Sequence, residues 1–307
     1  MLDDCLTQSS PFRENEEDDF RISLAGAQEK TALLKQASQW LRPVGPTPTT
    51  HILKLPIGSG NRGIDLSTSV QNEWLCAKIL AAFDVPVATS EIRTFGKHTI
   101  LEVERFDRVL SSDGNWLVRL PQEDFCQVTG TPGDLKYEGE SGPGISAIMK
   151  LLRGSVAAEQ DRRMFMRIQI LFWLLCAIDG HAKNFSIFLL AESRFRLTPS
   201  YDVLSAYPVL GNAKKQLSPH KVKMAMAVSG KNRYYRWNEI SLEHWLATAQ
   251  ECGFGANIEA LLKEILARVP SAIEKVRGET PSEFPSHVSD SIFEGLQKSA
   301  DKLLSQI

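Results

Sequence analysis

The order of hydrophobic and polar positions divides the chain at about residue 121 into a strand-rich first part and a helix-rich second part. In the first part, short stretches of alternating apolar and polar residues predict strands at residues 51–55, 99–106 and 115–120. Two further strand-like pieces are expected between residues 20 and 34, around a turn of small residues. The segment from Gln71 to Phe83 places its apolar residues three or four positions apart and predicts a helix.

Helical spacing dominates after the segment from Pro121 to Phe125, which breaks the pattern and is expected to connect two lobes. Helices are predicted at residues 145–152, 160–178, 242–249, 258–269 and 289–305, and a strand hairpin at residues 185–190 and 194–197. The second half of helix 160–178 is almost entirely apolar, which is typical of a helix buried in a core. The plan is an α+β fold with a strand-rich N-terminal lobe, residues 20–121, and a helical C-terminal lobe, residues 122–307.

Composition and charge narrow the function classes. Lys and Arg total 35 against 37 Asp and Glu, so the net charge of −2 gives no general attraction to nucleic acid or anionic lipid. The five cysteines show no metal-binding spacing and are expected to be reduced thiols. Residues 1–19 are polar and acidic and predict a flexible arm without a secretory signal. No apolar run is long enough to cross a membrane, so a cytoplasmic protein is expected.

The strongest chemical signal is the hexapeptide from Asp179 to Asn184, at the end of the predicted core helix. Protein kinases have an Asp and, five residues later, an Asn in their catalytic loop. The Asp orients the hydroxyl that accepts the phosphoryl group, and the Asn holds a magnesium ion on the phosphates. Asp202 follows the predicted hairpin, where a kinase has its second metal-binding carboxylate, although Tyr-Asp-Val replaces the usual Asp-Phe-Gly. Each of the three could instead cap a turn or a helix.

Two upstream features fit the same chemistry. Lys54 lies within an apolar strand, where its ammonium group requires an anion, and nucleotide phosphates together with a helix carboxylate such as Glu73 would supply one. Glu73 could equally be a solvated helix residue. A phosphate loop is expected around residues 23–30, where backbone N–H groups of small residues could cradle phosphate; the candidates are Ala25, Gly26, Ala27 and Gln28.

Several longer motifs together resemble the HipA family of bacterial toxin kinases: FRISLAGAQEK, THILKLP, SVQNEW, VERFDR, RLPQEDFCQ, KYEGESGPGI, DGHAKNFSIF, LTPSYDVLSAYPVL and MAMAVSG. The resemblance runs from about Phe20 to near the C-terminus. It implies a two-lobed, protein-kinase-like fold that uses ATP and Mg²⁺, with residues 20–121 as the ATP-binding lobe.

The resemblance also implies roles for individual residues. Asp179 would be the catalytic Asp, Asn184 and Asp202 would hold Mg²⁺, and Lys54 would contact the ATP phosphates. The other residues that it places at the nucleotide or the transferred phosphoryl are His181, Lys183, Tyr201, and Glu123 and Phe125 in the adenine-reading connector. His181 could instead be a structural residue hydrogen-bonded within the loop, and Lys183 could face solvent. Ser23 matches the serine that family members autophosphorylate. A phosphate there would add negative charge to a loop that holds ATP phosphates and would disable the site.

The chain departs from the longer family members, because only the acidic arm precedes the RIS motif. This shortening resembles the HipT toxins, although Arg21 stands where those proteins often carry a second serine. The partners implied are a HipS-like small protein in place of the missing subdomain and a HipB-like helix-turn-helix antitoxin, through which alone the chain would meet DNA. The implied substrate is an aminoacyl-tRNA synthetase, glutamyl or tryptophanyl, whose phosphorylation would inhibit translation.

Two other function classes stay open at this point. The chain could be a pseudokinase or regulatory subunit that docks a DNA-binding antitoxin, although all four kinase side chains, Lys54, Asp179, Asn184 and Asp202, are present. It could also phosphorylate a small molecule on the same scaffold. Transfer of labelled phosphate to protein separates the kinase hypothesis from both.

Overall fold

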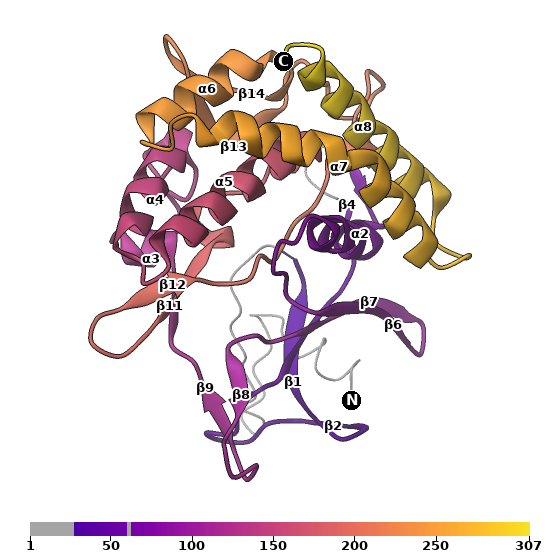
Figure 1. Cartoon of the computed structure of the whole chain (residues 1–307). Helices are drawn as coiled ribbons and strands as arrows, with labels where there is room; N and C mark the ends of the chain where they lie inside the picture. The colour runs from indigo at the N-terminus through magenta and orange to yellow at the C-terminus, as the bar shows by residue number, and fades with distance from the viewer. Residues whose placement is uncertain (1–27, 60–62) are drawn as a thin grey trace. The chain divides into compact units, whose positions relative to one another are not determined.

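The computed structural model describes residues 28–59 and 63–307, which form two compact units (Figure 1). Unit 1 contains the described residues up to Trp74 together with residues 88–120, and unit 2 contains residues 75–87 and 121–307. Helix α2, Ser69–Ala82, is thus divided between them. The acidic arm predicted at residues 1–19, and the strand-like segment that follows it up to residue 27, lie outside the described residues.

Unit 1 is built on a five-stranded antiparallel sheet with the strand order β2-β1-β3-β7-β6. The strands are β1 Lys30–Gln36, β2 Gln39–Leu41, β3 His51–Lys54, β6 Ser90–Phe95 and β7 His98–Glu104. Because β3 is the central strand, its backbone is paired on both sides, with β1 and with β7. Leu53 of this strand packs with Leu33 and Ile100 in a buried cluster. The prediction of a strand that carries Lys54 is therefore confirmed.

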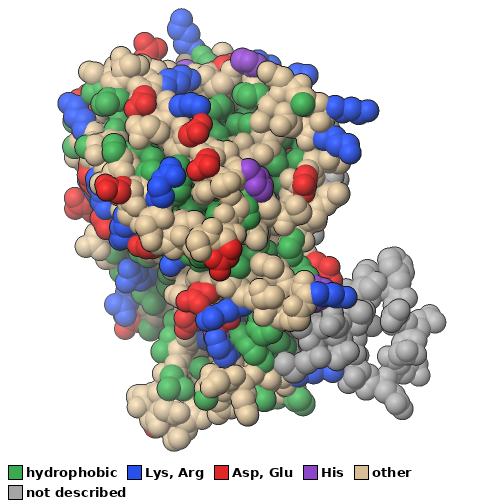
Figure 2. Space-filling view, turned by 90° about the vertical axis from the view of Figure 1, so that its right-hand side faces the viewer, with side chains coloured by type: hydrophobic (Ala, Val, Ile, Leu, Met, Phe, Trp, Pro, Cys, Tyr) green, Lys and Arg blue, Asp and Glu red, His purple; other side chains and the backbone are tan. Residues whose placement is uncertain are grey.

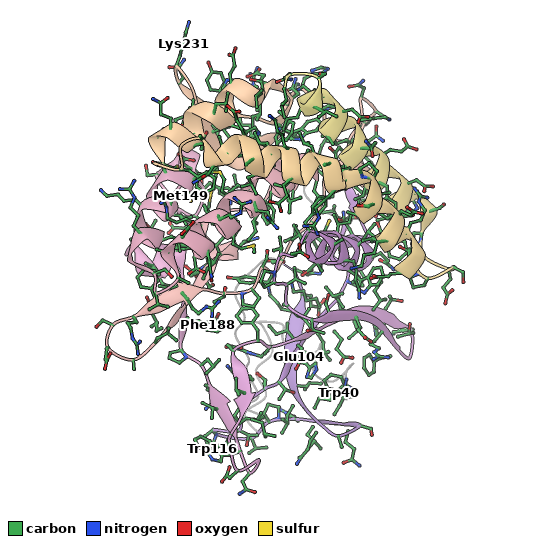
Figure 3. All side chains as sticks on the ribbon, viewed as in Figure 1. Trp40, Glu104, Trp116, Met149, Phe188 and Lys231 are labelled. Atoms are coloured by element: carbon green, nitrogen blue, oxygen red, sulfur yellow. The ribbon has the colours of Figure 1, made fainter. Side chains whose placement is uncertain are left out.

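Two small hairpins complete unit 1: β4 Gly58–Ser59 with β5 Asp65–Leu66, and β8 Arg108–Leu110 with β9 Leu117–Arg119. The base of the β8–β9 hairpin is fixed by the buried carboxylate of Asp107, which lies 2.8 Å from a guanidinium nitrogen of Arg105 and 2.6 Å from one of Arg108. Trp116, labelled in Figure 3, lies on this hairpin and is 61% exposed.

Unit 2 is mainly helical (Figure 1). Its main helices are α3 Phe125–Val128, α4 Ile145–Leu151, α5 Ala158–Leu174, α6 Leu242–Glu251, α7 Asn257–Glu279 and α8 Ser286–Leu304. Its 3₁₀ helices are η2 Glu138–Glu140, η3 Leu152–Gly154, η4 Ala182–Asn184, η5 Tyr207–Val209 and η6 Trp237–Glu239. Its strands are β10 Gln122–Asp124, β11 Ser186–Leu189, β12 Phe195–Leu197, β13 Lys223–Ser229 and β14 Arg233–Arg236.

The second half of α5 is buried on all sides, from Phe165 to Leu174, as its composition predicts. In Figure 1, α7 and α8 lie side by side, and the two helices are in contact. Acidic and basic side chains are intermixed over the face drawn in Figure 2, which agrees with the nearly balanced charge. In the described part of the chain, no helix combines the length and apolar character that crossing a membrane requires.

Helix α5 ends four residues before the predicted end at Ile178, and the backbone shows why. Cys176 has a left-handed φ of 49°. Its N–H donates to the carbonyl of Trp173 at 3.0 Å, and the N–H of Ala177 donates to that of Phe172 at 2.7 Å. These two bonds form a Schellman motif, which usually has Gly at the left-handed position. Because this chain has Cys there, the apolar pattern continues past the last helical residue, and the sequence gives no sign of the helix end.

Other elements also differ from the prediction. Helix α7 continues through Pro270 to Glu279, although proline usually ends a helix; Ala272 and Val276 beyond it are buried, so tertiary packing outweighs the missing N–H donor. The predicted connector from Pro121 to Phe125 is the edge strand β10 followed by the start of α3. The strands β6, β13 and β14 were not predicted.

A tyrosine and a glycine fix α8 onto η5. The hydroxyl of Tyr207 lies 2.8 Å from the carbonyl oxygen of Leu174, 2.9 Å from that of Gly295 and 2.7 Å from the hydroxyl of Ser299. A Cβ atom at position 295 would lie 2.5 Å from the Tyr207 ring, so only glycine allows this approach. At Gly278, in α7, a Cβ would meet nothing within 4 Å.

We therefore expect opposite effects from the same substitution at these two positions. Gly295→Ala should lower the free energy of unfolding by about 1–2 kcal/mol, because overpacking exceeds the gain in helix propensity. Gly278→Ala should leave it unchanged or raise it by up to about 1 kcal/mol. Urea unfolding of both variants measures the difference, and equal stabilities would contradict the packing described for Tyr207.

Candidate active site

The loop from Asp179 to Asn184 connects α5 to β11 in unit 2 and packs directly on the helix that precedes it. A Cβ atom on Gly180 would lie 2.4 Å from the ring of Phe172, so the loop can approach the helix this closely only with glycine at this position. The loop ends in the 3₁₀ turn η4, where the N–H of Asn184 donates to the carbonyl of His181 at 2.9 Å. The Schellman motif and Gly180 together determine where the loop lies.

Asn184 brings the two predicted aspartates to one place. Its side chain is buried, and its Nδ2 atom donates to the backbone carbonyl of Asp179 at 3.2 Å and to that of Asp202 at 3.2 Å. Asp202 has a left-handed φ of 60°, a conformation that Asp tolerates better than most residues. The structure thus places Asp179, Asn184 and Asp202 next to one another.

The carboxyl group of Asp179 has a partner that the sequence analysis did not identify. The hydroxyl of Tyr137 donates to Oδ1 of Asp179 at 2.5 Å. Burial raises the pKa of Tyr137 above its usual value of 10, and the hydrogen bond to the Asp179 carboxylate raises this pKa further. Tyr137 stands in the motif KYEGESGPGI, which signalled the family but gave no role to the tyrosine.

His181 lies between the two aspartates in the sequence and is 6% exposed. Its backbone N–H donates to the carbonyl of Asp179 at 2.8 Å, and its ring meets that of Tyr137 edge to face, with 5.2 Å between centroids. Burial lowers the pKa of His181 below its usual value of 6.5, against the opposing charge of Asp179, and so favours the neutral imidazole. Its Nδ1 atom is buried and has no hydrogen-bond partner in the described structure.

Lys183 and Tyr201 make their observed contacts within unit 2. The Nζ atom of Lys183 lies 2.8 Å from Oδ2 of Asp124, the residue that caps α3. The hydroxyl of Tyr201 donates to the carbonyl of Lys183 at 3.0 Å and lies 2.5 Å from the hydroxyl of Ser186. Burial raises the pKa of Tyr201, so its phenol stays protonated. Both residues hold the loop against neighbouring elements.

The predicted charge pair of unit 1 is formed. The Nζ atom of Lys54, on β3, lies 2.6 Å from Oε1 of Glu73, on α2, and the two side chains are 8% and 7% exposed. The Nε2 atom of Gln28 donates to the carbonyl of Leu55, directly after β3, at 2.5 Å. The other residues predicted for the phosphate loop, and the predicted phosphorylation site, lie outside the described residues: Ser23, Ala25, Gly26 and Ala27.

The sequence model of the HipA-like C-terminal domain matches residues 22–273, which is most of the chain. The chain belongs to the HipA-like C-terminal domain family. It is 34% identical to "Putative kinase Y4mE" of Sinorhizobium fredii over 259 residues, 83% of this chain and 56% of that protein. It is 27% identical to the serine/threonine-protein kinase toxin HipA of Shewanella oneidensis over 272 residues, 83% of this chain and 57% of that toxin.

Two solved structures have a similar fold. HipA from Shewanella oneidensis, in its complex with HipB and operator DNA, gives a TM-score of 0.77 at 23% identity, over 94% of this chain and 66% of that chain. The kinase CtkA of Helicobacter pylori gives 0.61 at 11% identity, over 94% and 93%. These similarities confirm the predicted kinase-like α+β fold. This HipA-like chain spans little more than half the length of the curated relatives that it matches.

Two residues predicted at the adenine also make contacts within unit 2. The ring of Phe125 is fully buried against Phe165, and the N–H of Phe125 donates to the carbonyl of Phe185 at 3.1 Å. The Phe125 ring is therefore part of the core of this HipA-like domain, and its role at the adenine stays a prediction. Phe125 is the first residue of α3.

The backbone of Glu123 is used within the sheet. Ladder hydrogen bonds join Pro121 to Leu189 and Phe125 to Phe185. In an antiparallel pair, hydrogen-bonded positions alternate with non-bonded ones, so Glu123 exchanges its backbone bonds with Ile187, its partner in the register. The same alternation turns the backbone groups of Gln122 to the other side of β10. The role of Glu123 at the adenine stays a prediction.

The donor set suits a hard divalent cation. In the described part of the chain, no three His, Cys, Asp or Glu side chains gather as a metal cluster, so the prediction depends on a carboxamide and a carboxylate. Both amide contacts of Asn184 are made by its nitrogen, which leaves the oxygen end of the side chain directed away from those two carbonyls. Carboxamide and carboxylate oxygens are ligands that Mg²⁺ accepts.

The buried pair in unit 1 gives a stability prediction. Glu73→Gln should lower the free energy of unfolding by about 1.5–3 kcal/mol, because the ammonium of Lys54 loses its charged acceptor in a buried position. Lys54→Met together with Glu73→Gln should recover most of that loss, since no buried charge then remains. Urea unfolding of the single and double variants makes the comparison. A double variant no more stable than Glu73→Gln would contradict it.

Proposed function

We propose that this chain is an ATP- and Mg²⁺-dependent serine/threonine protein kinase of the HipA toxin group. Asp179 acts as the catalytic carboxylate and accepts the proton of the serine hydroxyl. The γ-phosphoryl group is transferred from ATP to the serine oxygen, and ADP leaves. Asn184 and Asp202 hold the metal. Lys54 contacts the phosphates, and Glu73 holds the Lys54 ammonium group in place. The names of the two curated relatives support the same reaction class.

The observation that carries this proposal is the double hydrogen bond from Nδ2 of Asn184. In a kinase the catalytic Asp, the metal-binding Asn and the metal-binding Asp must all lie close to the phosphates of one bound ATP. Here a single carboxamide bonds to the backbone of both aspartates, which are far apart in the sequence. Three unrelated caps or turn residues would have no reason to meet in this way.

The residues around the loop fit a bound nucleotide. The unpartnered Nδ1 atom of His181 is a polar group that a ligand or water would satisfy at this position. Asn184 and Asp202 would hold the Mg²⁺, which when bound neutralises negative charge on the phosphates. Lys183, neutralised by Asp124, holds the loop in place, and we assign it a positioning role rather than a catalytic one.

The partners proposed follow the relatives. HipA of Shewanella oneidensis forms a complex with HipB and operator DNA, so we propose a HipB-like antitoxin as the partner through which this chain reaches DNA. A HipS-like small protein is a second proposed partner. The proposed substrate is a serine of an aminoacyl-tRNA synthetase, glutamyl or tryptophanyl, whose phosphorylation inhibits translation.

Incubation with γ-labelled ATP and Mg²⁺ tests the activity. We expect label on Ser23 of the wild-type chain and none on the Asp179→Gln variant, because the carboxylate that accepts the serine proton is missing. Asp134→Asn, which removes an exposed carboxylate of unit 2, is the matched control and should label like the wild type. ATP binding without transfer in any form would favour the docking role instead.

The phosphoproteome of cells that express the wild-type chain tests the substrate. We expect a phosphoserine on an aminoacyl-tRNA synthetase that is absent from cells expressing Asp202→Ala, because loss of this carboxylate removes a metal ligand and with it phosphoryl transfer. Mass spectrometry identifies the protein and the residue together. New phosphosites on other proteins alone would contradict the synthetase, and turnover of a metabolite without phosphoprotein would contradict protein kinase activity.

A further inference from the structure

The segment that carries Tyr137 is joined to the candidate catalytic loop at three points. The Tyr137 hydroxyl donates to the Asp179 carboxylate at 2.5 Å, and the Tyr137 ring packs edge to face on His181. In addition, the N–H of Ala182 donates to the carbonyl of Lys136 at 3.3 Å. A side-chain bond, a ring contact and a backbone bond therefore connect the same two segments.

The opposite end of this segment is anchored in unit 2. The N–H of Ala227, on β13, donates to Oε2 of Glu138 at 2.6 Å. The Glu138 carboxylate fills the space beside Gly144, where a Cβ atom would lie 2.1 Å from its carboxyl carbon. The carbonyl of Tyr137 accepts from the N–H groups of Glu140 and Gly142, both at 2.9 Å. The backbone of Tyr137 is therefore bonded within its own turn, and the neighbouring Glu138 links that turn to β13.

The hydrogen bond to Asp179 has the properties of an orienting contact. A donor to a carboxylate forms one of the stronger hydrogen bonds in proteins, and it fixes the rotation of the carboxyl group about its last bond. With Oδ1 bonded to Tyr137, the other carboxyl oxygen has a defined direction. A general base acts efficiently only when its oxygen lies within hydrogen-bond reach of the proton that it removes.

We propose that Tyr137 is a positioning residue of the phosphoryl-transfer site, which holds one oxygen of the Asp179 carboxylate so that the other meets the acceptor hydroxyl. This inference rests on the kinase function proposed above. It assigns to the KYEGES motif a part in orienting the catalytic group. Tyr137 touches Asp179 and acts through it.

Replacement of Tyr137 by phenylalanine tests this role. The ring and its contact with His181 remain, and only the hydroxyl is lost. We expect the maximal rate of Ser23 autophosphorylation to fall about 10- to 100-fold, the size expected for one hydrogen bond to a charged group. The ATP concentration that gives half-maximal rate should change less than about twofold, because Tyr137 is not assigned to the nucleotide. The urea midpoint of the variant reports on folding.

Tyr235→Phe is the control, since this half-buried tyrosine lies beside Gly139 of the same segment. It should leave both kinetic constants unchanged.

A Tyr137→Phe variant as fast as the wild type would overturn the inference. A faster variant would also overturn it, because Tyr137 would then obstruct the acceptor position. A slow variant with weakened ATP use or a lowered urea midpoint would show a merely structural role. An inactive wild-type chain would instead remove the kinase function itself, and the wild-type arm alone reports that outcome.

Discussion

The side-chain nitrogen of Asn184 donates to the backbone carbonyls of Asp179 and Asp202, and the arrangement of the candidate site depends on these two bonds. Asp202 has a left-handed backbone conformation, which costs a non-glycine residue about 1 kcal/mol or more. Such a conformation persists only where the surrounding structure holds it. The bond from Asn184 is one such restraint. The turn after β12 and the loop after α5 are thereby fixed to each other by one buried carboxamide.

Asparagine suits both the observed hydrogen bonds and the metal binding proposed for this position. The carboxamide nitrogen supplies the donors that the two carbonyls need, and its oxygen is a hard ligand of the kind that a magnesium site uses. An aspartate at 184 has no donor and would place a negative charge beside two carbonyl oxygens. A glutamine would move the amide outward by one methylene group. Structural support and candidate metal binding are therefore combined in one side chain, and its substitution disturbs both.

The sequence predicted the parts of the site that depend on local pattern. The strand with Lys54, the helix with Glu73, the core helix before Asp179 and the hairpin before Asp202 all form at or near the predicted residues. The predicted end of α5 was four residues too late. Cys176 takes the left-handed conformation that ends the helix, a position where glycine usually stands and would have indicated the end. The burial of the Phe125 ring and the backbone pairing of Glu123 were not predicted, because both depend on the pairing of β10 with β11.

Tyr137 shows a different limit. Its neighbours in the sequence are polar residues and glycines, which indicate a turn and nothing more. Its contact with Asp179 joins residues on either side of α4 and α5, so no spacing rule connects them. The next residue, Glu138, accepts from the N–H of Ala227, and Gly144 leaves room for that carboxylate. In the role proposed for it, the KYEGES motif does no chemistry itself and acts by fixing the direction of the Asp179 carboxyl group.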